Sequence, residues 1–282
     1  MKNVFGYPYV KDGESHCDGE RFITARVDAD FKRELNDAAD DVLEMQEKSE
    51  IPGWAKLLSG ICLLGFMIVA VGIIRNIGEV SFSQMFQNAP ALFIVGGVCA
   101  VGWVVLKIVE SVKFKKVSAS GVIDRVADSM EQLDKRSEEL LGVPENHGKV
   151  DVLSFRYTEK NGKVKIKEDI FYKFSNDEMK LYRDKDNLCL ADIECVYSIP
   201  IADIKGYVLK KKKAEMDEWN KDVPFNKGRY KQYKIATNDY GTIFCKYYAL
   251  QFADVFGEYE LFFPVYELEA FKSIADAPVE NE

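Results

Sequence analysis

The sequence has few of the residues from which metal centres and nucleophilic sites are built. It contains two histidines, and its six cysteines form no CxxC pair. Structural zinc needs about four closely spaced Cys or His ligands, so we expect no metal ion. Glycine-rich phosphate loops of the GxxxxGKS, GxxxxGKT or GxGxxG type are missing as well. We therefore expect no cofactor and no small-molecule substrate.

The two histidines do not suggest catalysis. His16 adjoins Cys17, but a nucleophile and its base must meet side chain to side chain, with a third group orienting the base. His147 stands in the segment PENHGKV and is expected to be a linker residue. The carboxylates are scattered, and none forms an obvious acid–base pair. We predict that the chain is not an enzyme, with an unrecognised enzymatic site as an alternative.

Two long runs carry no charge at all, although the mean hydropathy of −0.19 is that of an ordinary soluble protein. Residues 57–74 and 89–106 are each eighteen residues of apolar and small side chains. At 1.5 Å per residue each forms about 27 Å of helix, close to the roughly 30 Å hydrocarbon core of a bilayer. Buried helices of soluble proteins usually keep a polar stripe, which is missing here. We predict a transmembrane hairpin with spans at about 55–75 and 89–109.

The basic residues near the span ends predict the orientation. Arg75 is the one basic residue of the connecting segment, and Glu79 offsets it. Basic residues flank the other ends of both spans: Lys48, Lys56, Lys107, Lys113, Lys115, Lys116 and Arg125. Because cytoplasmic flanks carry the excess of Lys and Arg, both termini are expected to be cytoplasmic. Outside the spans, the cysteines are then expected to stay free in a reducing cytosol: Cys17, Cys189, Cys195 and Cys245.

Small residues in the spans predict close helix packing. No ionisable or amide residue lies in either eighteen-residue core, which argues against an ion or substrate path. Gly96 and Ala100 form a small-xxx-small pair, and further positions of close approach are Gly60, Gly65, Gly72 and Gly102. Such residues allow packing within the hairpin or between copies. The connecting loop is expected to form a short interfacial helix with Phe82, Met85 and Phe86 on one face.

Heptad-like spacing flanks the hairpin on both sides. Apolar residues recur at intervals of three and four within 30–48 and again within 119–141, which predicts two amphipathic helices. Gly142 and Pro144 are expected to end the second helix. The apolar faces of these two helices have three possible partners: each other in a coiled-coil stalk, a second copy of the chain, or the C-terminal domain.

From Gly148 onward the apolar pattern takes the period of strands. The runs flanking Asn161-Gly162 predict a hairpin with a tight turn, and further strand-like runs follow, such as LCLADIECVYSI and TIFCKYYALQFAD. Seven or eight short strands with polar turns predict an antiparallel β-barrel or sandwich. The last apolar segment, PVYELEAFKSIA, predicts a C-terminal helix that plugs the open barrel end.

Seven or so strands followed by one amphipathic helix resemble the pleckstrin-homology-like (PH-like) superfold. SIPIADIKGYVL at 198–209 and YELFFPVYELEAFKSI at 259–274 are similar to strand and terminal-helix patterns of bacterial PH-like domains. The resemblance covers about 148–276, and the insertion at 214–227 and the first hairpin depart from it. It implies a bacterial cell membrane, and binding of lipid, binding of peptide or scaffolding, because this superfold serves all three.

The strongest local signal is positive charge. Ten basic residues lie within 205–234 against four acidic ones, in a chain of net charge −8. Each near-surface Lys or Arg contributes about 1 kcal/mol of attraction to anionic lipid. The candidate residues for contact with anionic lipid or a partner are Lys210, Lys211, Lys212, Lys213, Lys227, Arg229, Lys231 and Lys234. The alternative is a solvated loop with lysines protecting sheet edges. Trp219 is expected either to insert into an interface or to cover the barrel.

Together these features predict an α+β membrane protein. Its expected parts are a tail and amphipathic helix (1–53), a transmembrane hairpin (54–112), a helical linker (113–147), a β-domain (148–276) and a short tail (277–282). The function that fits is a membrane-anchored interaction module, which presents the β-domain to a protein, a second copy or anionic lipid. An accessory subunit of a membrane enzyme or transporter is the alternative. No nucleic-acid-binding pattern accompanies the basic stretch.

Overall fold

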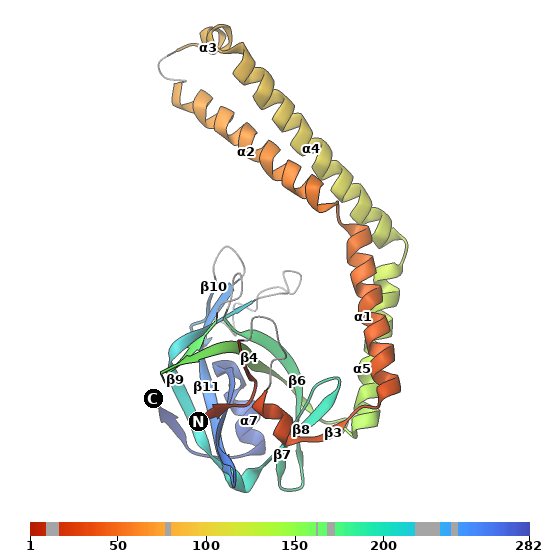
Figure 1. The fold of residues 1–282 in the computed structure, drawn as a ribbon, viewed down its shortest axis with the longest axis vertical. Coiled ribbons are helices and arrows are strands. Elements are labelled where there is room, and N and C mark those ends of the chain that lie inside the picture. Colours follow the sequence, from red (N-terminus) through yellow and green to blue (C-terminus); the bar gives the residue numbers. More distant parts are fainter. Residues whose placement is uncertain (10–16, 77–79, 162, 168–172, 218–231, 238–241) are drawn as a thin grey trace. The chain divides into compact units, whose positions relative to one another are not determined.

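The computed structural model describes residues 1–282 except 10–16, 77–79, 162, 168–172, 218–231 and 238–241. The chain is α+β and forms two compact units (Figure 1). The helical unit comprises Ala29–Leu133, and the β unit combines Met1–Asp28 with Asp134–Glu282. The β unit is therefore discontinuous in sequence. Its second segment begins at Asp134, before the expected boundary at 148. It also includes the N-terminal segment, for which the sequence predicts a separate part.

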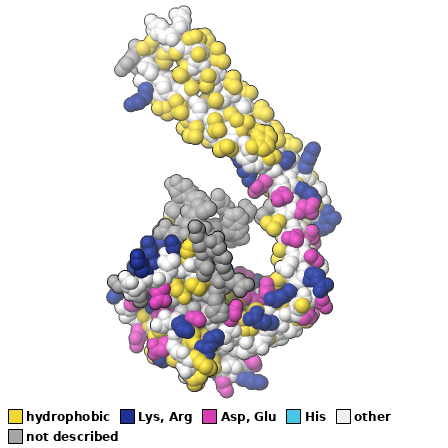
Figure 2. Space-filling model, viewed as in Figure 1, with side chains coloured by type: hydrophobic (Ala, Val, Ile, Leu, Met, Phe, Trp, Pro, Cys, Tyr) yellow, Lys and Arg dark blue, Asp and Glu magenta, His cyan; other side chains and the backbone are white. Residues whose placement is uncertain are grey.

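Two long apolar helices dominate the helical unit. These are α2 (Gly53–Asn76) and α4 (Pro90–Ala119), which pack as a hairpin. Both are long and apolar enough to cross a membrane. Apolar side chains cover the visible surface of the hairpin, while charged ones gather on the helices beyond it (Figure 2). Helix α4 runs ten residues past the expected span end, to Ala119, because no helix breaker precedes Gly121, whose φ is +66°.

Glycines set the contact between α2 and α4. A Cβ atom on Gly96 would lie 2.8 Å from Cγ1 of Val69, and one on Gly65 would lie 2.8 Å from Sγ of Cys99. Gly102 faces Cys62 in the same way, at 3.2 Å. The predicted close approach is confirmed at these three glycines. Gly60 and Gly72 have open space where a Cβ would stand, so they take no part in packing within the hairpin, and packing between copies stays a prediction for them.

The segment between the long helices forms the short helix α3 (Phe82–Asn88), as expected. Ser81 caps it: its hydroxyl accepts from the Gln84 backbone, and the Gln84 side chain accepts from the Ser81 backbone N–H. This reciprocal pair satisfies two helix N–H groups. The Phe82 and Phe86 rings contact the Phe93 ring on α4 at centroid distances of 5.3 and 5.4 Å. The aromatic face of α3 thus packs on the hairpin.

The two heptad segments form α1 (Ala29–Ser49) and α5 (Val122–Leu141). Both helices line one groove, with Ala38 and Met45 from α1 facing Val122 and Val126 from α5. This arrangement supports pairing within one chain. The end of α5, from Asp134 onward, instead belongs to the β unit, where Ser137 is buried. The end of α5 thus uses the C-terminal domain as a partner, while a coiled-coil stalk and pairing with a second copy stay predictions.

Helix α5 ends where the sequence predicts. Gly142 takes a left-handed φ of +68°, which glycine adopts without steric cost. The Val143 N–H then donates to the Glu138 carbonyl at 2.9 Å, as in the Schellman helix end.

The β unit is a curled half-barrel made of two sheets. The first sheet has the order β1-β12-β11-β9-β13, with β10 beside β11. Its strands are β1 (Lys2–Asn3), β9 (Ile204–Asp217), β10 (Ala236–Thr237), β11 (Thr242–Asp254), β12 (Gly257–Pro264) and β13 (Val279–Asn281). The second sheet has the order β2-β4-β6-β7-β8-β3, with β5 beside β4. Its strands are β2 (Gly6–Pro8), β3 (Ile23–Arg26), β4 (Gly148–Lys160), β5 (Lys163–Ile166), β6 (Ser175–Asp184), β7 (Asn187–Ala191) and β8 (Cys195–Pro200).

Strand β11 is buried on both faces. Tyr248, Leu250 and Phe252 enter one hydrophobic core, and the alternating residues Cys245, Tyr247 and Ala249 enter another. This is the period-two pattern of a strand with apolar residues at nearly every position. The helix α7 (Leu268–Ile274) follows β12 after one short 3-10 turn, and its Phe271 ring stacks on Phe263 with 4.1 Å between centroids. The expected C-terminal helix is thus present and covers the first core.

The predicted hairpin is confirmed for its described residues, which exclude Gly162. Strands β4 and β5 pair up to Lys160 and Lys163, and Asn161 has a left-handed φ of +55°. The expected N-terminal tail is wrong for its described residues. Strand β1 pairs with β12, β2 pairs with β4, and Val4 and Phe5 are core residues. The expected C-terminal tail is also wrong, because β13 runs parallel to β9. Strands of two or three residues are too short to show a period.

The glycine contacts make a prediction about the hairpin. Gly96→Leu should force α2 and α4 apart, because Val69 is branched at Cβ and fills the space. Overpacking of this kind costs about 1–3 kcal/mol, and each 1.4 kcal/mol changes an opening equilibrium tenfold. We expect thiol labelling of Cys62 and Cys99 in detergent, followed by peptide mass spectrometry, to become about tenfold faster. Gly97→Leu, which places the same side chain in open space, is the matched control. Equal labelling rates in both variants would contradict the assigned contact.

Candidate functional site

The predicted basic residues fall into four groups in the structure. Lys211, Lys212 and Lys213 are exposed on β9. Lys210 is not: its side chain is 14% exposed, its ammonium lies 2.8 Å from the Glu260 carboxylate, and it also approaches the Phe262 ring. Lys234 has a left-handed φ of +55° in a turn before β10. The other predicted contact residues, Lys227, Arg229 and Lys231, lie outside the described residues. Trp219 lies outside them as well.

The lysine run forms an irregularity in the sheet. On β11 one residue, Tyr247, lies between Lys246 and Tyr248, while three residues of β9 lie between their partners Lys213 and Leu209. The three are Lys210, Lys211 and Lys212. A bulge of this kind bends the strand and re-aims side chains. The sequence predicted the basic run but not this change of register.

A groove beside the bulge is the strongest candidate for a binding site. Its volume is about 580 Å³. Residues from β5, β9, β11 and the segment before β6 line it: Val164, Lys165, Ile166, Lys173, Phe174, Lys212, Lys213, Glu215 and Tyr247. We call these nine residues the basic groove. Two of the predicted contact residues, Lys212 and Lys213, belong to it.

The basic groove combines an aromatic floor with a cationic rim. The rings of Phe174 and Tyr247 are buried and contact each other at a centroid distance of 5.4 Å. Phe155 and Phe262 pack against them in turn, which makes the floor rigid. On the rim, the Lys173 ammonium lies 2.5 Å from Glu215. The remaining three lysines have no ion-pair partner among the described residues: Lys165, Lys212 and Lys213.

Sequence reasoning missed half of this site. Lys165 and Lys173 come from the first hairpin and its surroundings, about forty residues before the lysine run. The alternation in KVKIK, which places lysines on one face of β5, was the available signal. It did not reveal which strand lies opposite.

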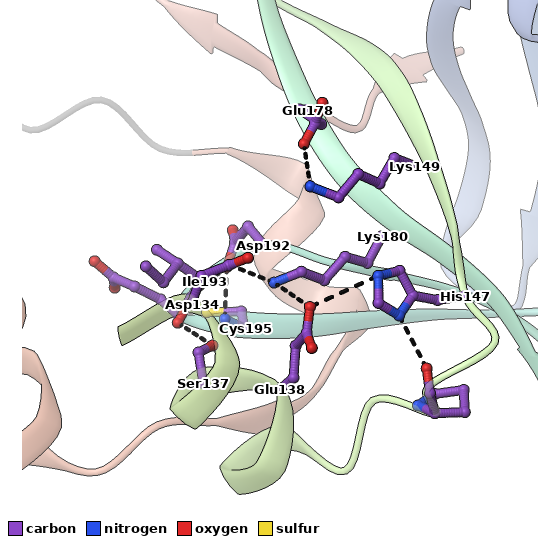
Figure 3. A network of polar contacts seen from close by, with 12 residues as sticks. Asp134, Ser137, Glu138, His147, Lys149, Glu178, Lys180, Asp192, Ile193 and Cys195 are labelled. Atoms are coloured by element: carbon purple, nitrogen blue, oxygen red, sulfur yellow. Dashed lines mark hydrogen bonds and ion pairs between the residues drawn. The ribbon is translucent and has the colours of Figure 1, made fainter. Parts of the chain in front are cut away.

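A second cluster of polar residues joins the end of α5 to the second sheet (Figure 3). The Lys180 ammonium from β6 lies 2.5 Å from Asp134 and 3.3 Å from Glu138, and its side chain is 8% exposed. His147 places Nε2 at 3.6 Å from Glu138 and Nδ1 at 2.9 Å from the Pro144 carbonyl. As expected, His147 stands in the connection between α5 and β4. The sequence did not predict its partners.

Backbone contacts complete this cluster. The Ser137 hydroxyl donates to the Ile193 carbonyl at 2.7 Å. In the same turn, Asp192 accepts from the backbone N–H groups of Glu194 and Cys195. These groups hold one another in fixed positions, so the cluster fastens a helix to a sheet.

The buried thiols are poor nucleophiles. Burial raises the pKa of the Cys17 thiol to about 11 and that of Cys245 to about 12. Burial also raises the pKa of Cys189, which lines a polar hollow of about 440 Å³ together with Thr24 and Ser198. Because the thiolate is the reactive form, these cysteines are unreactive near neutral pH. All six cysteines are free. Within the described ranges no three His, Cys, Asp or Glu side chains are grouped to hold a metal ion.

The cluster around Lys180 predicts a stability effect. Lys180→Met keeps the packing of the chain but leaves Asp134 and Glu138 without their cation. Removing one partner of a fully buried pair costs about 3–5 kcal/mol, and the partial exposure of these carboxylates reduces this to about 2 kcal/mol. The thermal midpoint of the β unit should fall by about 4–8 °C, measured by near-ultraviolet circular dichroism of the full chain in mild detergent. Lys149→Met, which breaks the exposed pair with Glu178, should change it by less than about 2 °C. Equal shifts would mean that the buried pair carries no special weight.

The comparisons with known proteins found no relative of this chain. No protein-family model matches the chain. No curated protein and no solved structure matches it either.

Proposed function

We propose that this chain is a membrane-anchored, non-enzymatic interaction module whose β unit binds partners at the cytoplasmic surface of a bacterial cell membrane. In this proposal α2 and α4 cross the membrane as a hairpin, and α3 lies on the far side. The outward apolar surface of both helices supports insertion, since a helix that is apolar all round needs an apolar environment. Basic residues lie at the start of α2 (Lys56) and near the end of α4 (Lys113, Lys115 and Lys116). They support a cytoplasmic location for these two helix ends.

The discontinuous β unit gives independent support for two spans. Strands β1, β2 and β3 precede the hairpin in sequence, and they pair with β12, β4 and β8, which follow it. Strands of one sheet cannot be separated by a bilayer. If α2 crosses the membrane, α4 must therefore return the chain to the same side.

We also propose that the β unit is a PH-like domain. The curled half-barrel followed by α7 is compatible with that fold. The additional strands β1, β2, β3 and β13 are departures from it. Because PH-like folds serve several binding functions, this assignment does not choose the ligand.

The basic groove is the observation that carries the binding proposal. A flat lipid surface contacts protruding lysines, but it does not fill a concave site with an aromatic floor. Lys210 and Lys173, moreover, are already paired with Glu260 and Glu215. The combination of buried rings with ammonium groups that have no ion-pair partner in the described part of the chain fits an apolar side chain flanked by carboxylates. We therefore propose an acidic protein segment, and not the lipid headgroup, as the ligand.

The proposed topology predicts a labelling pattern. Ser83 in α3 and Ser118 at the end of α4 are both exposed. In intact cells, a membrane-impermeant maleimide should label a Ser83→Cys variant, and should label Ser118→Cys only after permeabilisation. The unmodified chain controls for its own cysteines. Labelling of both variants in intact cells would rule out a crossing between them.

The binding proposal is tested with the full chain in nanodiscs of neutral lipid. The probe is a fluorescent peptide of alternating glutamate and phenylalanine, and binding is followed by anisotropy. Substituting Lys165, Lys212 and Lys213 by Gln should weaken binding at least tenfold. The matched control replaces three lysines outside the groove, namely Lys149, Lys185 and Lys272, and should leave binding within about twofold. Raised salt should weaken binding to the unmodified chain.

A second arm uses vesicles of phosphatidylglycerol in place of the peptide. Vesicle binding without peptide binding would show that the groove reads anionic lipid, against the proposal. No binding of either probe, or equal loss in the groove and control variants, would remove the groove as a site.

A further inference from the structure

Strand β13 covers part of one edge of the first sheet. It runs parallel to β9, with Val279 opposite Tyr207 and Asn281 opposite Leu209. Among the described residues β9 is its one neighbouring strand. All three side chains of β13 are exposed, so few apolar contacts add to its backbone pairing. A strand with so little burial is one of the parts of a sheet that open most easily.

The segment just before β13 is firmly attached. Ala275 is buried, and its carbonyl accepts from the Tyr207 hydroxyl at 2.7 Å. The Pro278 carbonyl accepts from the Tyr207 N–H at 2.8 Å, and a Cβ atom on Gly206 would lie 2.8 Å from that carbonyl oxygen. Residues 279–282 can therefore leave β9 while the residues before them keep their contacts.

An acidic side chain continues the ladder beyond β13. The Glu282 N–H donates to the Leu209 carbonyl at 3.1 Å. The Lys211 N–H donates to the Glu282 carboxylate, also at 3.1 Å, where a regular ladder would use a backbone carbonyl. The Lys210 ammonium lies 4.0 Å from the same carboxylate. Residues 279–282 thus meet the lysine run with an extended backbone and a carboxylate.

This end of the chain lies at the margin of the basic groove. Lys212 and Lys213 follow Lys211 on β9, and both line the groove. Burial raises the pKa of the floor residue Tyr247 to about 12, and the negative charge of Glu282 adds to this effect. The edge of β9 that residues 279–282 cover is therefore continuous with the groove.

The basic groove lies between two strands. Residues 164–166 of β5 line it together with Lys212 and Lys213 of β9. In the described part of the chain β5 pairs with β4 alone. A peptide that lies along a strand edge gains most from the backbone groups there when it is itself extended. We therefore expect the ligand of the groove to bind as a strand.

We propose that residues 279–282 are a built-in competitor for this ligand. They occupy the edge of β9, and an extended, acidic segment of a partner protein displaces them when it pairs with β9 from Tyr207 into the groove. This inference rests on the proposed function and adds the regulation of the same groove. The resident segment shows what the edge accepts: a parallel direction, an extended backbone and a carboxylate beside Lys210 and Lys211. Because it is tethered, its effective concentration is high, and it lowers the affinity for outside segments.

A disulfide that locks β13 on β9 tests the proposal. Val208→Cys and Glu280→Cys place two cysteines at directly paired positions, with Cα atoms about 5 Å apart, as a disulfide requires. The full chain in nanodiscs of neutral lipid is probed with the fluorescent glutamate–phenylalanine peptide. We expect the oxidised form to bind it at least tenfold more weakly than the same protein after reduction. Each single-cysteine variant is a matched control and should bind equally before and after reduction.

Removal of the competitor should act in the opposite direction. A chain that ends at Pro278 should bind the peptide at least threefold more tightly than the unmodified chain. The deletion removes exposed residues, so the near-ultraviolet circular dichroism of the β unit should stay the same. Glu280→Ala, which keeps the backbone pairing of β13, is the control and should leave the affinity within about twofold.

These measurements separate failure of this inference from failure of the proposed function. Equal binding by the locked and reduced forms, or unchanged or weaker binding after the deletion, would overturn the inference and leave the groove as a site. If the unmodified chain, the reduced form and the truncated chain all fail to bind the peptide, both proposals are overturned.

Discussion

The β unit depends on the burial of β11 on both of its faces. Its alternating residues contribute to two hydrophobic cores, one on each face of the strand. The strand therefore connects the two cores, whereas a strand at the surface would contribute to only one. Its neighbour β9 pairs with it from Thr242 to Phe252, and its other neighbour β12 pairs with it from Tyr247 to Asp254. The floor residue Tyr247 is part of this strand, so the geometry of the basic groove follows from β11.

Local signals in the sequence were sufficient for the elements that have long or strong patterns. The uncharged runs of eighteen residues gave α2 and α4, Gly142 gave the end of α5, and Asn161 gave the hairpin turn. These features depend on neighbours in the chain, on helix length or on a φ angle that few residues adopt. The segment before the hairpin was misjudged, because β1 and β2 have two and three residues and gain their stability from distant strands.

The candidate site was accessible from the sequence only in part. The sequence shows the positive charge along 210–213, but it does not show which partner each ammonium group has. Lys210 is paired with Glu260, fifty residues away, whereas Lys212 two positions later lines the groove. The two lysines have different surroundings because of the bulge opposite Tyr247, and no local sequence pattern predicts this bulge. Lys180 makes the same point: in the sequence it is one lysine among many, and in the structure it is a buried cation between two carboxylates of α5.

The position of the helical unit within the sequence of the β unit has a consequence for biosynthesis. A ribosome completes residues 1–28 long before β4, β8 and β12 leave the exit tunnel. During that interval the first strands have no sheet to join. Under the proposed topology, α2 and α4 are already being delivered to the translocation machinery in that interval, and the sheet can close only after the hairpin has been placed and the last strands have emerged. If the hairpin inserts as proposed, membrane integration is therefore expected to precede folding of the β unit in every molecule, whatever the intrinsic folding rate of the β unit.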